Sequence, residues 1–115
     1  MSDAVKQFRE ERERLNERVL AAGNLTVKRF FALDTQAYAA GALDVKTKEL
    51  LGLASSAVLR CDDCILYHII RCVEEGATDD EIVEALSIAL LVGGSIVIPH
   101  LRRAIDRLDE LRAAE

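Results

Sequence analysis

The chain has 115 residues, half of them hydrophobic, and a formal net charge of −5, which describes one domain with a core of moderate size. Its acidic balance, without a basic patch, argues against a nucleic-acid surface. The charged N-terminus lacks the apolar core of a signal peptide, and no apolar run approaches the roughly 18 residues of a membrane span. We therefore expect a cytoplasmic protein that does not bind membranes.

A first amphipathic helix is predicted by one apolar stripe through Val5, Phe8, Leu15 and Val19, ending at Gly23-Asn24. Arg12 falls within the stripe. On the solvated face, Glu10 has the spacing to pair with Arg14.

Further helices are bounded by end signals such as Asp44, a good N-cap, and the capping box TDDE at residues 78–81. We expect these helices over residues 25–40, 45–59, 61–76 and 78–93, with a last one that begins near Pro99. The predicted fold is all-α, a single-domain bundle of about six helices. Residues 1–24 form its N-terminal amphipathic helix and residues 25–115 its main helical domain.

The segment RCDDCILYHI, residues 60–69, places Cys61, Cys64 and His68 within about two turns of one helix. Thiols stay reduced in the cytoplasm, so a CxxC there is more often catalytic or metal-binding than structural. The helix N-terminus favours a thiolate, and the spacing allows a disulfide between the two sulfurs. His68, one turn after Cys64, could take or hold a proton. These are the parts of a dithiol enzyme.

Two carboxylates, Asp62 and Asp63, lie between the cysteines. Their charge opposes a neighbouring thiolate and should raise its pKa, so we predict a fairly reducing pair. Cys61, nearer the helix end, is expected to be the more exposed of the two cysteines.

The wider spacing Glu49-x11-Cys61-x2-Cys64-x3-His68 resembles the alkylhydroperoxidase D branch of the carboxymuconolactone decarboxylase-like family. The flanking LDVKTKELLGLASSAVLR and the later GATDDEIVEAL and LLVGG are also similar, so that the resemblance covers roughly residues 25–112. It implies an all-helical homo-oligomer, commonly a trimer or hexamer, that acts as a thiol-dependent peroxidase or disulfide reductase.

The resemblance also implies roles for these residues. Cys64 would attack the peroxide and become a sulfenic acid, Cys61 would resolve it as a disulfide, and Glu49 and His68 would move protons. A thiol reductant protein or a lipoyl-type donor would recycle the pair, without an organic cofactor. Asp63 stands where the best-known members have His, which favours dithiol exchange over peroxide turnover.

Two other functions remain open. A zinc-binding assembly protein would use Cys61, Cys64 and His68, completed by Glu49 or another subunit. A lactone-type decarboxylase of the same fold would not need the cysteines.

Some residues also have plain structural interpretations. Glu49 follows Lys46 and Lys48 and could be a surface carboxylate, whereas its apolar helical neighbours favour an inward position. Cys72 is expected to be a small buried hydrophobe. The remaining candidates, Tyr38, Tyr67 and His100, are expected to be packing or ordinary surface residues.

Overall fold

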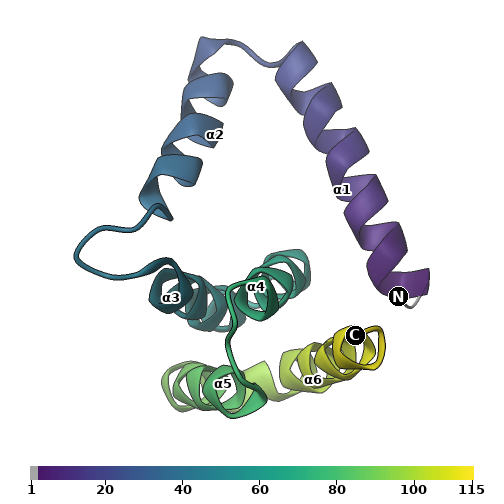
Figure 1. The fold of residues 1–115 in the computed structure, drawn as a ribbon, viewed down its shortest axis with the longest axis vertical. Helices are drawn as coiled ribbons and strands as arrows, with labels where there is room; N and C mark the ends of the chain where they lie inside the picture. The colour runs from purple at the N-terminus through teal and green to yellow at the C-terminus, as the bar shows by residue number, and fades with distance from the viewer. Residues whose placement is uncertain (1–2) are drawn as a thin grey trace.

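The computed structural model describes residues 3–115, which form six α-helices and a short 3₁₀ helix and include no strand (Figure 1). The elements are α1 (Asp3–Ala22), α2 (Leu25–Ala37), α3 (Val45–Val58), α4 (Asp62–Glu74), α5 (Asp79–Gly93), η1 (Ser95–Val97) and α6 (Ile98–Ala113). The all-α fold predicted from the sequence is confirmed.

Helices α3 to α6 pack together, and α1 and α2 form an arch above them (Figure 1). The strongest packing joins α3 with α4, α3 with α5, and α4 with α6. The start of α1 lies near the end of α6, so the arch returns to the bundle at its N-terminal end (Figure 1). The helical bundle is therefore residues 45–113, with the arch attached to it.

The helix ends follow local chemistry. The Asp44 side chain accepts the Thr47 backbone N–H at 2.7 Å, and Thr78 and Glu81 form the predicted capping box. Between α3 and α4, Arg60 adopts the left-handed conformation with φ 59°, which turns the chain back on itself. Helix α2 ends at Ala37 rather than at residue 40, and α4 ends at Glu74 rather than at residue 76, so both are shorter than predicted.

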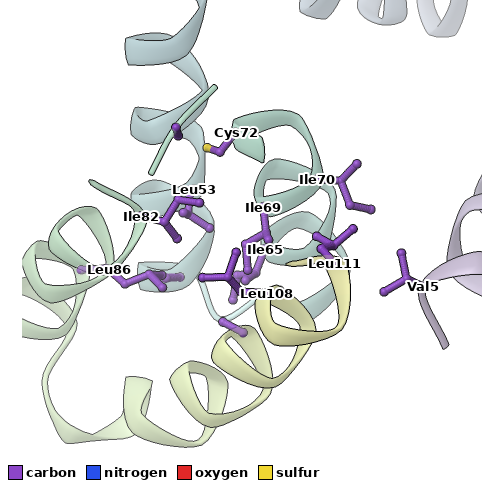
Figure 2. Close-up of a cluster of buried hydrophobic side chains, with 14 of the residues drawn as sticks. Val5, Leu53, Ile65, Ile69, Ile70, Cys72, Ile82, Leu86, Leu108 and Leu111 are labelled. Carbon is purple, nitrogen blue, oxygen red and sulfur yellow. The ribbon is translucent and has the colours of Figure 1, made fainter. Parts of the chain in front are cut away.

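The core lies among α3, α4, α5 and α6, with Val5 of α1 beside it (Figure 2). Leu53, Ile69 and Ile82 are fully buried in this cluster. Cys72 is also fully buried there, as predicted. The core is aliphatic, since Phe8 is only partly buried at its margin.

The apolar stripe of α1 divides into two parts. Val5 is fully buried, whereas Leu15 and Val19 are each 44% exposed on the arch. The prediction that Glu10 pairs with Arg14 is wrong: Arg14 binds Glu11 at 2.6 Å, three residues away rather than four. Within residues 3–115, no helix has the length and apolar character needed to cross a membrane.

The second arm of the arch, α2, contains no buried residue. Its Phe30 is 70% exposed and its Leu33 62% exposed. An isolated helix of this length is marginal in water, and most helices are stabilised by packing of an apolar face. The chain by itself supplies little such packing for α2.

Candidate redox site

Cys61 and Cys64 form a disulfide at the N-terminus of α4, with their Cα atoms 5.3 Å apart. Cys61 is the N-cap, and its Sγ accepts the backbone N–H of Cys64 at 3.3 Å. Cys64 is exposed and Cys61 half-buried, so the expectation that Cys61 would be the more exposed cysteine is wrong. The reason is its role as the cap, which turns the Cys61 sulfur over the first turn of the helix.

Glu49 of α3 and His68 of α4 meet in the interior, because the turn at Arg60 packs the two helices side by side. Glu49 Oε1 lies 2.8 Å from His68 Nδ1, and the two residues are 1% and 8% exposed. Arg71 Nε lies 3.5 Å from the other carboxylate oxygen, Oε2. Glu49 is therefore not a surface carboxylate, despite its lysine neighbours in the sequence.

The contacts of His68 show which of its ring nitrogens carries a proton. A carboxylate only accepts hydrogen bonds, so Nδ1 carries the proton that is donated to Glu49. In the neutral ring, Nε2 then holds a lone pair, and the Tyr38 hydroxyl lies 3.4 Å from it. Tyr67 packs edge-on against the same ring, with the centroids 5.1 Å apart. His68 is thus oriented with a basic nitrogen available.

Gly52 provides the space for this histidine. A Cβ atom at Gly52 would lie 2.6 Å from the Tyr38 hydroxyl and 2.7 Å from His68 Cε1. Neither contact is possible without movement, so no larger residue fits at position 52 of α3 with His68 in this place.

Cys64 and His68 both line a cavity of about 780 Å³ between the arch and α4. Phe8, Arg12 and Leu15 of α1 line its opposite side. The Arg12 guanidinium lies 3.9 Å from the centre of the Tyr67 ring, a cation–π contact that accounts for an arginine in the apolar stripe. A small molecule in this cavity would reach the exposed sulfur and the histidine together.

The third cysteine has no part in the site. Burial, and then the nearby Glu49 carboxylate, raise the pKa of Cys72 to about 12, so this thiol is protonated and unreactive at neutral pH. Among residues 3–115, no three His, Cys, Asp or Glu side chains gather as a set of metal ligands.

The structure thus brings the four predicted site residues together as two pairs, the Cys61–Cys64 disulfide and the Glu49–His68 hydrogen bond. Sequence reasoning missed Gly52 and Arg71, and it set Tyr38 aside as a packing residue. Gly52 and Arg71 had a signal, since each lies three residues after a predicted site residue on the same helix. Tyr38 had none, because it reaches His68 from another helix end.

The carboxymuconolactone decarboxylase family model matches residues 24–107. Two crystal structures of a Thermotoga maritima protein are similar over nearly the whole chain. One has a TM-score of 0.94 at 66% identity and covers 95% of this chain and 96% of that one. The other has a TM-score of 0.90 at 65% identity, covers 93% and 91%, and is described as a family member with a suggested involvement in antioxidative response.

A family member from Legionella pneumophila, solved in its apo form, has a TM-score of 0.86 at 28% identity, covering 95% of this chain and 97% of that one. Among curated proteins, uncharacterized protein 4 in the cox locus of Paracoccus denitrificans is 36% identical over 85 residues, 74% of this chain and 77% of that protein. The chain belongs to the carboxymuconolactone decarboxylase family.

Proposed function

We propose that this protein is a dithiol oxidoreductase in which Cys61 and Cys64 cycle between dithiol and disulfide while it reduces a hydroperoxide or a disulfide. The observation that carries the proposal is the disulfide-linked pair at a helix N-terminus, with its exposed member beside a buried Glu–His pair. The suggested antioxidative involvement of the Thermotoga maritima relative agrees with such chemistry.

With a hydroperoxide, the Cys64 thiolate attacks the terminal oxygen and breaks the O–O bond. Cys64 becomes a sulfenic acid, and the leaving alkoxide takes a proton to become an alcohol. The Cys61 thiolate then attacks the Cys64 sulfur, forming the disulfide and releasing water once the hydroxide is protonated. An external dithiol restores the pair by two exchange steps and leaves as a disulfide.

Cys64 is proposed as the attacking thiol because it is exposed on the cavity, whereas Cys61 is half-buried as the helix cap. His68 Nε2, basic because Nδ1–H is donated to Glu49, would accept the Cys64 proton and return it to the leaving group. Glu49 would hold the tautomer and stabilise the protonated ring.

Asp63 bears on the choice of substrate. Its exposed carboxylate lines the cavity next to Cys64, where the family branch carries a histidine. A negative charge there opposes the thiolate. We propose that disulfide exchange with a thiol protein or a lipoyl-type donor is at least as important as peroxide reduction.

The test is a count of free thiols, on reduced and metal-stripped protein, before and after one equivalent of an organic hydroperoxide. Wild type should lose two thiols together and keep Cys72. In Cys64→Ser, Cys61 should stay reduced. In Cys61→Ser, a sulfenic acid should accumulate on Cys64 and react with a dimedone probe. Cys72→Ser is the matched control, and it should lose the same two thiols as wild type.

Oxidation by a disulfide reagent but not by peroxide would define a disulfide reductase. If neither reagent oxidises the pair, the redox proposal is wrong. Activity on a lactone that survives Cys64→Ser would establish the decarboxylase alternative instead.

A further inference from the structure

Asp62, the first residue of α4, is bound by two basic side chains at the start of α6. Its Oδ2 accepts the Nε–H of Arg103 at 2.9 Å, and its Oδ1 lies 2.7 Å from His100 Nδ1. Arg103 Nη2 also lies 3.3 Å from His100 Nδ1. That nitrogen cannot accept from Arg103 while it donates to Asp62, so the shorter contact to the carboxylate defines the pairing.

This carboxylate therefore differs from its neighbour. Burial opposes the ionisation of Asp62, but hydrogen bonds from His100 and Arg103 outweigh it and lower the pKa of the carboxyl group. Asp63 is exposed and lines the cavity with Cys64. The sequence predicted that both carboxylates oppose the thiolates, whereas the structure pairs one of them.

The pairing also fixes the segment that carries the sulfurs. Cys61 directly precedes Asp62 and caps α4, and Cys64 lies in the same first turn. Helix α6 packs along α4 (Figure 1). The two bonds to Asp62 therefore attach the start of α4 to the start of α6. These bonds to Asp62 restrict the positions that the sulfur atoms of Cys61 and Cys64 can adopt.

We propose that Arg103 and His100 are positioning residues of the redox pair: by binding Asp62, they offset its charge beside Cys61 and fix the first turn of α4, which favours the thiolate form of the reduced pair. This inference rests on the proposed dithiol function. It gives a role to His100, which the sequence offered only as an ordinary residue.

The other charged groups around this point do not replace the pairing. Arg107, one turn further along α6, binds Glu110 at 2.7 Å and Asp106 at 3.3 Å. Arg60 lies in the preceding turn, and its side chain is exposed. The ring of His68 is bound by Glu49 rather than by Asp62. Arg103 is the cation bound directly to Asp62 among the residues described.

The test compares single and double charge variants of Asp62 and Arg103 by the pKa values of the two thiols. The pKa values of Cys61 and Cys64 are measured from the pH dependence of their alkylation in the reduced protein, each followed separately by peptide mass spectrometry. Arg103→Gln leaves the Asp62 charge without its cation and should raise the thiol pKa by about half a unit. Asp62→Asn leaves the cation and should lower it by a similar amount.

The double variant Asp62→Asn/Arg103→Gln should return close to wild type, and Arg103→Lys, which keeps the charge, should stay close to it. Arg102→Gln is the matched control, because Arg102 is the exposed neighbour of Arg103 on α6 and should change nothing. A purely structural bond would lower the melting temperature of both single variants without moving the thiol pKa in opposite directions.

Shifts in the same direction, or shifts no larger than that of Arg102→Gln, would overturn the inference. Should Arg103→Gln fail to fold, Asp62→Asn carries the test, since it leaves no unpaired carboxylate. Thiol pKa values can be measured whether or not the pair reacts with peroxide. A failure of the proposed function and a failure of this inference are therefore separate results.

Discussion

His68 donates its Nδ1–H to Glu49 across 2.8 Å, at a place where Glu49 is only 1% exposed. The bond joins two helices that are adjacent in the chain, yet its partners are 19 residues apart. A carboxylate in the interior requires such partners, since burying an unpaired charge is very costly. The site therefore depends on the packing of α3 against α4 as much as on the cysteines.

Glu49→Gln tests this bond. The glutamine can present either an oxygen or an NH₂ group to His68, so the ring loses its fixed tautomer and a basic Nε2 is no longer assured. We expect oxidation of the two thiols by hydroperoxide or disulfide at neutral pH to slow by about 100-fold. Glu74→Gln, which removes an exposed partner of Arg71, is the control and should keep the wild-type rate. Equal rates in both variants would contradict a role for Glu49 in proton transfer.

Gly52→Ala tests the space beneath His68. In an ordinary helix this change is stabilising by about 1 kcal/mol. Here the new methyl group would displace Tyr38 or His68, so we expect a net loss of about 1–3 kcal/mol in the free energy of unfolding, together with slower thiol oxidation. The comparison is Gly41→Ala, whose Cβ would meet only Lys48 Nζ at 3.6 Å. Denaturant unfolding that ranks the two variants equally would remove Gly52 from the site.

The Asp62 pairing predicts a dependence of stability on pH. The pKa of this carboxyl group is lower in the folded protein than its ordinary value near 3.8. Its contribution is therefore fully present above that value and is lost as the pH falls through the folded pKa. At pH 6, Asp62→Asn should melt below wild type, and the difference should shrink towards pH 3. A melting-temperature difference that stays constant over this range would show that the charge of Asp62 adds nothing to stability.

The exposed apolar side chains of the arch predict that the protein forms an oligomer. Since α2 contains no buried residue and exposes Phe30 and Leu33, we propose that a second copy of the chain covers it. Phe30→Glu should then lower the mass measured by light scattering towards that of the monomer. Gln36→Glu, which adds the same charge at an exposed polar position of α2, should leave the mass unchanged. A monomeric wild type would refute the proposal directly.

The sequence predicted the helices well because their ends are local. Asp44 and Thr78 each bond to a backbone group within three residues, and such signals can be read without the fold. The end of α2 depends on a distant contact instead. Lys48 of α3 donates to the carbonyl oxygens of Ala37 and Ala39. No sequence signal near residue 40 predicts this contact.

The candidate site likewise has one part that local spacing predicts and one part that depends on long-range packing. The four predicted residues follow from spacing along two adjacent helices. The bonds from Asp62 to His100 and Arg103 span 38 and 41 residues, and only the packing of α6 on α4 reveals them. The exposure of the two cysteines was predicted in the wrong order, because the capping role of Cys61 depends on its backbone conformation.

The two tyrosines beside His68 also provide an intrinsic fluorescence signal from the site. The chain has two tyrosines and no tryptophan, so tyrosine dominates its intrinsic ultraviolet fluorescence. Both emitters touch the same imidazole: Tyr38 and Tyr67 have ring centroids 5.3 and 5.1 Å from that of His68. Protonation of this ring would therefore alter the environment of both tyrosines. Tyrosine emission followed while the two thiols are oxidised would report on the site without a label.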